Sequence, residues 1–296
     1  MKRFRLAHLS DPHLGPLPRP PLASLVSKRI FGYLNWQKNR RRALGANVLA
    51  AILNDVAVQN VDHVCVTGDL VNIALPEEFC NAARWLETLG EAASVSVVPG
   101  NHDAYVPGAA KRAAKAWAPW CSGDAGPGFP FARRRGPILI AGVSTAVATP
   151  PLIASGRVGK PQRDALAALL DRHDDAFKVI MIHHPPDAAE ASGRRGLDDV
   201  EEVREVLAAG CVDLVLHGHT HHASLNWLET ARGRAAVVGV PSASSDGTKH
   251  PIAGYALVDI DPERHIVRLV RRGLPSPEGA VRTVEAVDLD LRPPRG

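Results

Sequence analysis

Ligand-type side chains gather in five short stretches of this sequence, and their spacing is typical of metal coordination. Two stretches hold a pair separated by one residue, Asp11 with His13 and His219 with His221. In an extended segment this spacing sends both side chains to the same side, so each pair can bind one ion. Carboxylate and imidazole groups suit Mn²⁺, Fe or Zn²⁺, and the stretches contain no cysteine. The sequence therefore predicts a divalent metal site without thiolate ligands.

The other three stretches add further ligands and a candidate acid. They are Gly68-Asp69, Gly100-Asn101-His102-Asp103 and His183-His184-Pro185. Taken alone, Gly68-Asp69 or Gly100-Asn101 would suit an ordinary turn. Two ions about 3.5–4 Å apart that share a carboxylate form a clamp for in-line displacement at phosphorus. The five stretches together favour such a two-ion site over a set of unrelated turns.

Each stretch follows a short apolar run, and these runs alternate with segments that carry apolar residues at helical spacing. The alternation predicts βαβ units and a largely parallel sheet. Ligands collect beyond the carboxyl ends of such strands, so the stretches are expected to meet at one edge. The predicted strands are 4–9, 63–67, 94–98, 138–143, 178–182 and 212–216, and the predicted helices are 46–59, 77–89, 161–173 and 198–208. Segments 235–240, 255–260 and 265–270 predict further strands without helices between them, with a hairpin turn at 261–264.

In their order along the chain, the five stretches resemble the signature of the calcineurin-like metallophosphoesterase superfamily. The resemblance is closest to its class III cyclic-nucleotide-phosphodiesterase branch and covers residues 11–221, with every block of the signature present. Each block alone is common, whereas five blocks that each follow a predicted strand are specific. The resemblance implies an α/β fold, an αββα sandwich of two facing mixed sheets flanked by helices, with a dimetal site at the strand ends. It also implies an enzyme, a hydrolase of phosphoesters.

The resemblance further implies a role for each residue of the stretches. The first ion would be held by Asp11, His13 and His221, and the second by Asn101, His183 and His219, with Asp69 bridging both. A hydroxide between the ions would attack phosphorus. His102 would stabilise the phosphoryl oxygens or protonate the leaving group, and Asp103 would orient the His102 imidazole. His183 is preferred to His184 as the ligand because it is the first residue after the strand.

A basic segment follows the first stretch and must begin at the rim of the site. Residues 12–54 contain no Asp or Glu but seven Lys and Arg residues, three of them in the run Arg40-Arg41-Arg42. Apolar residues recur at helical spacing from Leu22 to Leu34, which predicts an amphipathic helix within 17–42. One hypothesis makes 17–42 a lid in which Arg40, Arg41 and Arg42 bind an anionic or lipid-linked substrate. The alternatives are a helix packed on its own domain and a segment that docks on a membrane surface.

Composition limits the class of protein. The chain has 296 residues, a formal net charge of +4 and 45% apolar residues, which is globular composition. One domain is expected at 1–274, with a C-terminal tail at 275–296. Four widely spaced cysteines without a Cys-x-x-Cys pair favour free thiols and a cytoplasmic location, with peripheral contact at the inner face of the membrane as an option. Because the positive charge is concentrated in one segment, no nucleic-acid partner is expected, and no oligomeric state is predicted.

The expected function is dimetal-dependent hydrolysis of a phosphoester, with a phosphodiester favoured, by in-line attack of a metal-bridging hydroxide. One alternative is a pyrophosphohydrolase for a nucleotide–lipid diphosphate of the UDP-diacylglucosamine type at the membrane surface, which the basic segment favours. Another is a non-catalytic metal-binding scaffold of the same fold, which the presence of all ligands and His102 disfavours. A nuclease of the family would be expected to add a capping domain and a broad basic surface, and a protein phosphatase would need a docking groove.

Overall fold

Two six-stranded sheets pack face to face in the computed structural model, which describes residues 3–40 and 45–292. The strands of the first sheet are β1 (Phe4–Leu9), β2 (His63–Val66), β3 (Val95–Val97), β12 (Gly254–Asp261), β13 (Ile266–Gly273) and β14 (Arg282–Asp290). Their order in the sheet is β14-β13-β12-β1-β2-β3. Strands β1, β2 and β3 are parallel, whereas β12 runs antiparallel to β1. The four residues of β2 are all buried, as the continuous apolar run predicts for a strand covered on both faces.

The second sheet repeats this mixed arrangement. Its strands are β6 (Phe131–Arg135), β7 (Ile138–Gly142), β8 (Phe177–Met181), β9 (Leu214–His217), β10 (Ser224–Thr230) and β11 (Gly233–Gly239). Their order is β10-β11-β9-β8-β7-β6, with β7, β8, β9 and β11 parallel. A short ribbon of β4 (Ser122–Gly123) and β5 (Gly126–Pro127) forms a separate sheet.

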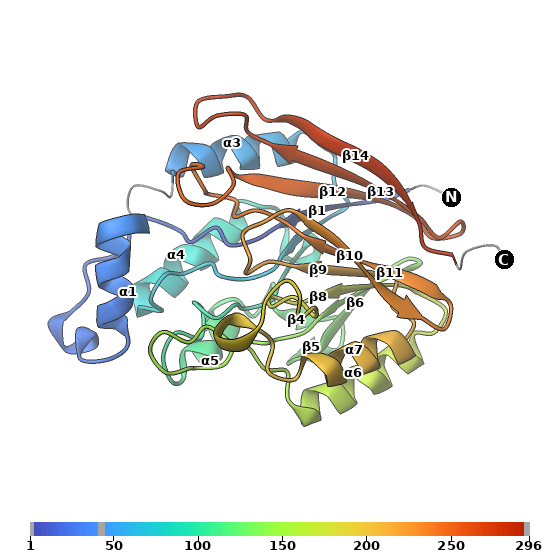
Figure 1. The fold of residues 1–296 in the computed structure, drawn as a ribbon, viewed down its shortest axis with the longest axis horizontal. Coiled ribbons are helices and arrows are strands. Elements are labelled where there is room, and N and C mark those ends of the chain that lie inside the picture. Colours follow the sequence, from blue (N-terminus) through green and yellow to red (C-terminus); the bar gives the residue numbers. More distant parts are fainter. Residues whose placement is uncertain (1–2, 41–44, 293–296) are drawn as a thin grey trace.

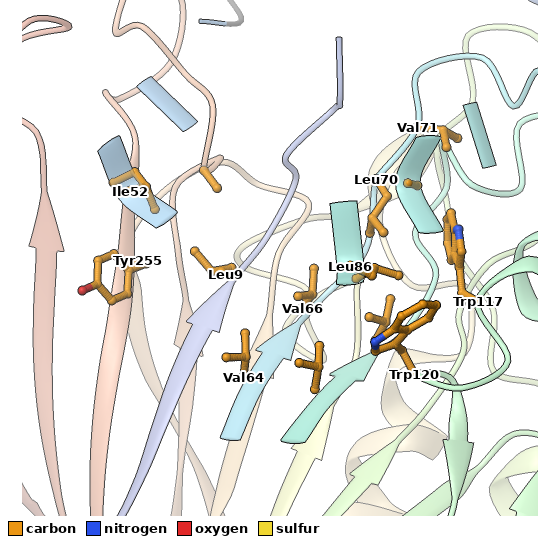
Figure 2. Close-up of a cluster of buried hydrophobic side chains, with 14 of the residues drawn as sticks. Leu9, Ile52, Val64, Val66, Leu70, Val71, Leu86, Trp117, Trp120 and Tyr255 are labelled. Atoms are coloured by element: carbon orange, nitrogen blue, oxygen red, sulfur yellow. The ribbon is translucent and has the colours of Figure 1, made fainter. Parts of the chain in front are cut away.

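Helices cover the outer faces of both sheets (Figure 1). Apolar side chains of α3 (Ala46–Ala57), α4 (Pro76–Glu87) and α5 (Ala109–Ala116) belong to the core outside the first sheet. Figure 2 shows part of this core, with Ile52 of α3 and Leu86 of α4 near the strand residues Leu9, Val64 and Val66. On the second sheet, α6 (Lys160–Arg172) and α7 (Val200–Ala209) complete another cluster. A third cluster, which includes Leu6 of β1 and Val179 of β8, lies between the sheets. This arrangement confirms the predicted αββα sandwich of two mixed sheets.

The tail expected at 275–296 contains a strand that the sequence pattern did not predict. Residues Arg282–Asp290 form β14, which pairs antiparallel with β13 along its length, with one irregularity between Arg271 and Arg272. Most side chains of β14 are exposed, and Leu289 is an exception that joins the core between the sheets. An edge strand of this kind carries too little apolar alternation to stand out in the sequence.

The basic segment 17–42 does not form the single amphipathic helix that its spacing predicts. It contains η1 (Leu22–Leu25), the short helix α1 (Arg29–Asn35) and a π-helical turn, η2 (Trp36–Arg40). Ser24 and Ser27 interrupt the helix, because their hydroxyl groups bond to nearby backbone at Pro21 and at Ser24 and Arg29. Figure 1 shows α1 at the end of the molecule toward which β1 runs. Among the described residues, no helix is both long enough and apolar enough to cross a membrane.

Candidate metal centre

The loops after five parallel strands bring the predicted ligands together at one edge of the sandwich. Asp11 and His13 follow β1, Asp69 follows β2, Asn101 follows β3, His183 follows β8, and His219 and His221 follow β9. Six of these seven side chains are buried, and the His221 side chain is 13% exposed. Four groups, each with ligand atoms within 4.8 Å of one another, are Asp11/His13/His221, Asp11/Asp69/His183, His13/Asp69/His102 and His183/His184/His219. Asn101 bonds to His183 and His219, so the structure joins all seven residues in one polar cluster.

Asp11 is at the centre of the first ligand group. Its Oδ1 lies 3.2 Å from Nε2 of His221 and 4.0 Å from Nε2 of His13. The same His13 nitrogen lies 3.9 Å from Oδ2 of Asp69, so Asp69 faces this group from the other side. The backbone amide of His219 donates to Oδ2 of Asp11 at 3.0 Å and fixes the carboxylate. Asp11, His13 and His221 are the three side chains predicted to bind the first ion.

The second ligand group, Asn101, His183 and His219, brings one amide oxygen and two ring nitrogens close together. Oδ1 of Asn101 lies 3.2 Å from Nε2 of His183 and 2.9 Å from Nδ1 of His219. The other nitrogen of each ring has a backbone partner, since Nδ1 of His183 bonds to the carbonyl of Thr67 at 2.6 Å and Nε2 of His219 bonds to the carbonyl of Arg195 at 2.9 Å. If both rings are neutral, those carbonyls take the N–H and the facing nitrogens present lone pairs toward the amide oxygen. One oxygen and two imidazole nitrogens arranged in this way form a donor set that suits a divalent cation.

Asp69 connects the two groups. Its Oδ2 lies 3.5 Å from Nε2 of His183 and 3.9 Å from Nε2 of His13, while its Oδ1 accepts a hydrogen bond of 2.7 Å from the backbone amide of His102. Donor atoms around one ion with bonds of about 2.0–2.2 Å lie roughly 3 Å apart. The separations of Asn101 Oδ1 from the His183 and His219 nitrogens, 3.2 and 2.9 Å, are close to that value, whereas His13 Nε2 lies 4.0 and 3.9 Å from the oxygens of Asp11 and Asp69. The donor set fits divalent cations, with Asp69 between the two groups.

The backbone at the ligands is strained. Asp11, His13, Asp69, His219 and His221 have φ between 40° and 68°, the left-handed region that side-chain-bearing residues avoid. Ten residues other than glycine have positive φ in the described part of the chain, and half of them are these ligands. Such strain costs of order 1–3 kcal/mol per residue and is kept where it serves a site. Here it aims successive side chains at a common point.

Burial and charge set the pKa values of the cluster. Burial alone would lower the pKa of His183, but the carboxylates of Asp69 and Asp11 raise it to about 9. Burial would raise the pKa of Asp69, but the rings of His183 and His102 hold it well below its usual range. Burial lowers the pKa of His219 well below its usual value, which keeps that ring neutral. The carboxylate of Asp69 and the ring of His219 are therefore in the forms that bind metal, whereas His183 would release a proton on binding.

His102 lies beside the ligands, and a carbonyl group orients its ring. Nδ1 of His102 bonds to the backbone carbonyl of Asn72 at 2.5 Å, and the ring is 4.8 Å from that of His13. The loop that carries Asn72 is itself fixed by the buried Glu78 of α4, whose carboxylate accepts from the amides of Asn72 at 2.6 Å and Leu75 at 2.8 Å. Because Nδ1 of His102 bonds to the Asn72 carbonyl, the other ring nitrogen, Nε2, is directed away from that carbonyl.

Asp103 has a different role from the one predicted. Its carboxylate accepts hydrogen bonds from the backbone amides of Asp69 at 2.9 Å, Val71 at 3.1 Å and Gly100 at 2.8 Å. It thereby ties the loop after β3 to the loop after β2. Asp103 was expected to orient the His102 imidazole. Its carboxylate bonds to the three backbone amides instead, and the carbonyl of Asn72 orients the ring. Asp103 supports the site by holding two ligand loops in register.

The geometry separates His183 from His184. His184 uses both nitrogens elsewhere, Nδ1 with the hydroxyl of Thr145 at 2.7 Å and Nε2 with the carbonyl of Ala154 at 3.0 Å. Burial lowers the pKa of His184 to about 3, with the neighbouring His183 adding to the effect. His183, in contrast, directs Nε2 at Asp69 and Asn101. His184 also lies within 4.8 Å of His183 and His219, but its hydrogen bonds to Thr145 and Ala154 occupy both of its nitrogens, so His183 stays the predicted ligand.

Two aromatic neighbours of the site were not predicted from the sequence. The ring of Tyr105 stacks on that of His102, with centroids 5.5 Å apart and 17° between the planes. The ring of His250 lies edge-on to that of His221, with centroids 4.8 Å apart. Neither residue belongs to a ligand-type stretch. The only signal for Tyr105 is its position two residues after Asp103, in the loop that follows β3.

The predicted substrate-binding arginines cannot be placed at the site. Arg41 and Arg42 lie outside the described residues, as does the side chain of Arg40. Two cations earlier in the segment, Lys28 and Arg29, anchor it to the rest of the protein. Lys28 donates to the hydroxyl of Thr149 at 2.8 Å, and Arg29 donates to the carbonyls of Ile73 and Ala74 at 2.9 and 2.7 Å. Lys28 and Arg29 therefore hold α1 against the body of the protein.

Comparisons with known proteins place this geometry in a family. The family model described as calcineurin-like phosphoesterase matches residues 4–223. A probable cyclic nucleotide phosphodiesterase of Synechococcus is 27% identical over 218 residues, which cover 72% of this chain and 78% of the relative.

Two solved structures share the fold. A purple acid phosphatase from yellow lupin seeds superposes with a TM-score of 0.62 at 13% identity, over 98% of this chain and 54% of the lupin chain. This chain thus spans about half the length of the lupin enzyme. A dimetal phosphatase from Danio rerio superposes with a TM-score of 0.55 at 17% identity, over 97% of this chain and 99% of the other. Together with the family match, the five converging loops lead to one conclusion: the chain belongs to the calcineurin-like phosphoesterase family and is a hydrolase of phosphoesters.

Proposed function

We propose that this protein hydrolyses a phosphodiester with two divalent metal ions at the candidate metal centre. The observation that carries the proposal is the convergence of Asn101, His183 and His219 on one point beside Asp69, with separations of 2.9–3.5 Å. Nitrogen and oxygen donors of this kind suit Mn²⁺, Fe or Zn²⁺. When bound, such a pair of ions would neutralise the phosphoryl oxygens and acidify the attacking water. A phosphodiester is favoured over a monoester because the name of the Synechococcus relative points to one.

The chain supplies the remaining chemistry through His102. With Nδ1 held by the carbonyl of Asn72 at 2.5 Å, the protonated ring presents N–H at Nε2. The carbonyl also stabilises the cationic form of the ring. His102 would then donate this proton to the leaving oxygen or hydrogen-bond to the phosphoryl group, a contribution of about 10²–10⁴ in rate. Asp69 accepts a hydrogen bond from the backbone amide of His102. This bond holds His102, the proposed acid, beside the metal centre.

The proposal is tested with the metal-reconstituted protein and a chromogenic aryl phosphodiester. We expect His102→Ala to lower kcat by about 10²–10⁴ while the bound metal, measured by elemental analysis, stays at the level of the parent protein. Unchanged hydrolysis by His102→Ala would contradict the assigned role. If the parent protein does not hydrolyse the phosphodiester at full metal occupancy, the result would favour a non-catalytic metal-binding scaffold.

A second candidate substrate class is a nucleotide–lipid diphosphate. It is favoured by the position of the basic segment, since Lys28 lies 4.7 Å from the centre of the Tyr105 ring, which in turn stacks on His102. A panel of cyclic nucleotides, glycerophosphodiesters and UDP-linked lipids distinguishes the classes by kcat/KM. A preference of more than about tenfold for the lipid-linked diphosphates would replace the phosphodiester proposal, since tenfold corresponds to about 1.4 kcal/mol of transition-state binding. Either substrate class suits an enzyme of the cytoplasm.

A further inference from the structure

Apolar side chains gather on the outer face of the basic segment. The described residues include seven exposed large apolar side chains, and four of them lie within 22–34. Leu22 is 85% exposed, Val26 88%, Phe31 52% and Leu34 57%. Their density is far above the scattered single exposures that are normal on a protein surface. Phe31 and Leu34 belong to α1, whereas Leu22 belongs to η1 and Val26 follows it. We call these four residues together the apolar face of α1.

The apolar face is presented rigidly. Gly32 of α1 lies so close to Tyr105 that a β-carbon there would be 2.6 Å from the Tyr105 hydroxyl oxygen. Trp36 is 9% exposed and packs in a small cluster with Leu17, Ile73 and Leu75. With the anchors at Lys28 and Arg29 described above, one side of the segment is fixed to the protein body. The opposite side, with Phe31 and Leu34, is therefore held outward.

The segment that carries the apolar face has charges of one sign. No Asp or Glu occurs in residues 12–54, which contain seven Lys and Arg residues. Arg19 and Lys38 are exposed, and in the described part of the chain neither forms an ion pair. Apolar side chains surrounded by cations match the two layers of an anionic membrane, its acyl region and its charged headgroups.

A second copy of the chain fits this face less well. A symmetric dimer brings the same patch of both subunits together, so the cations of one copy would face those of the other. Like charges brought together in an interface disfavour association. A lipid surface supplies the opposite charge and imposes no such repulsion.

We propose that the apolar face of α1 docks this protein on the surface of an anionic lipid membrane. Leu22, Val26, Phe31 and Leu34 enter the headgroup boundary, and the exposed Arg19 and Lys38 contact anionic headgroups. Because α1 contacts Tyr105, which stacks on His102, docking brings the rim of the metal centre to the membrane surface. The inference concerns binding alone and stands apart from the proposed hydrolysis.

Vesicle flotation with the full metal-loaded chain tests the docking. We expect the protein to float with vesicles of phosphatidylcholine and phosphatidylglycerol at low salt, with a partition coefficient at least about tenfold higher than for phosphatidylcholine alone. Added salt should reduce the difference, since it screens the cations. The double variant Leu22→Ser/Val26→Ser should lose about tenfold or more in partitioning, and its hydrolysis of a soluble aryl phosphodiester should equal that of the parent.

Two control variants show whether vesicle binding depends on the apolar face of α1. Val58 and Val284 are 69% and 67% exposed at other sites, so Val58→Ser/Val284→Ser is the matched variant and should bind vesicles like the parent. His102→Ala should also bind like the parent, which distinguishes a failure of docking from a failure of catalysis. Parent protein that does not float with anionic vesicles, or Leu22→Ser/Val26→Ser that floats equally well, would overturn the proposal. A dimer in sedimentation that the double variant abolishes would assign the face to a second copy instead.

Discussion

The ring of Tyr105 lies nearly parallel to that of His102, with centroids 5.5 Å apart and 17° between the planes. The carbonyl of Asn72 fixes one edge of the His102 ring and Tyr105 covers one face, so the imidazole has little freedom to rotate. Tyr105 is in this sense a positioning residue, and it also contacts the basic segment through Lys28.

Replacing Tyr105 tests this arrangement. We expect Tyr105→Ala to lower kcat about tenfold, because a loosely held His102 spends less time in the productive orientation. Tyr105→Phe keeps the stacked ring and should retain most of the activity. The measurement is kcat and KM on a chromogenic phosphodiester at matched metal content. An unchanged kcat in Tyr105→Ala would show that Asn72 alone positions the ring.

Gly100 is required for the close approach of two ligand loops. A β-carbon at Gly100 would overlap Oδ1 of Asp69 and lie 2.7 Å from Cε1 of His183. We expect Gly100→Ala to displace the bridging carboxylate and to lower metal content and hydrolysis together, by about tenfold or more. Elemental analysis of the purified variant checks the expectation. Full metal occupancy in Gly100→Ala would mean that the loops can separate without loss of the site.

Removal of metal should destabilise the protein. Asp11 and Asp69 are buried together, so without cations their charges repel each other in a medium of low dielectric. Ligand binding at about 100 times its Kd stabilises a protein by about 2.7 kcal/mol, which corresponds to a Tm change of about 4 °C for a chain of this size. Calorimetry before and after dialysis against a chelator measures the difference. Equal Tm values for the two forms would contradict tight metal binding by the native state.

His63 makes stability depend on pH at a point remote from the ligands. Burial lowers its pKa to about 3, with Arg133 and Arg135 adding to the effect, whereas an unfolded histidine has a pKa near 6.5. The folded state therefore binds fewer protons, and the stability contributed by the neutral ring is full above about pH 6.5 and lost as the pH falls toward 3. From pH 7.5 to 5 the loss is about 2 kcal/mol.

Urea denaturation at these two pH values measures that loss. His63→Gln keeps a hydrogen-bonding partner for Ser96, which bonds to His63 at 2.8 Å, and has no group that titrates. The pH dependence of its unfolding free energy should be smaller than that of the parent by about 2 kcal/mol. An identical pH dependence in both proteins would assign the effect to other groups.

Replacing the basic run Arg40-Arg41-Arg42 tests the hypothesis that these residues bind the substrate. If Arg40, Arg41 and Arg42 bind an anionic substrate, replacing all three by Gln should raise KM by about tenfold and leave metal content unchanged, because each cation contributes a fraction of the binding energy. Steady-state kinetics with a charged and a less charged phosphodiester distinguish binding from a general loss of structure. A KM that does not change for either substrate would exclude the run from the binding site.

The convergence of the candidate ligands and the strands before them could be predicted because their signals are local. His183 follows a continuous apolar run, and an imidazole or carboxylate at such a position has few structural uses. The partners that hold those ligands left no signal in the sequence. The carbonyl of Asn72 could belong to any residue, and the carboxylate of Asp103 bonds to backbone amides that the sequence cannot place.

The elements that were missed are the exposed ones. Strand β14 has mostly exposed side chains, so no apolar alternation distinguishes it from a tail. In the basic segment, spacing alone predicts an amphipathic helix with an apolar stripe from Leu22 to Leu34, whereas the structure buries Trp36 and exposes Leu22, Val26 and Leu34. Periodicity shows which residues share a face, but it cannot show whether another part of the protein covers that face.

The position of β1 in the first sheet has a consequence for synthesis of the chain. Phe4 pairs with Ile260, and the hydroxyl of Ser242 bonds to the carbonyl of Asp11, so contacts at β1 join residues about 230 to 260 positions apart. During synthesis, β1 has one edge without a partner strand until β12 has left the ribosome. Unpaired strand edges promote aggregation, so a chaperone that shields them would act during this interval.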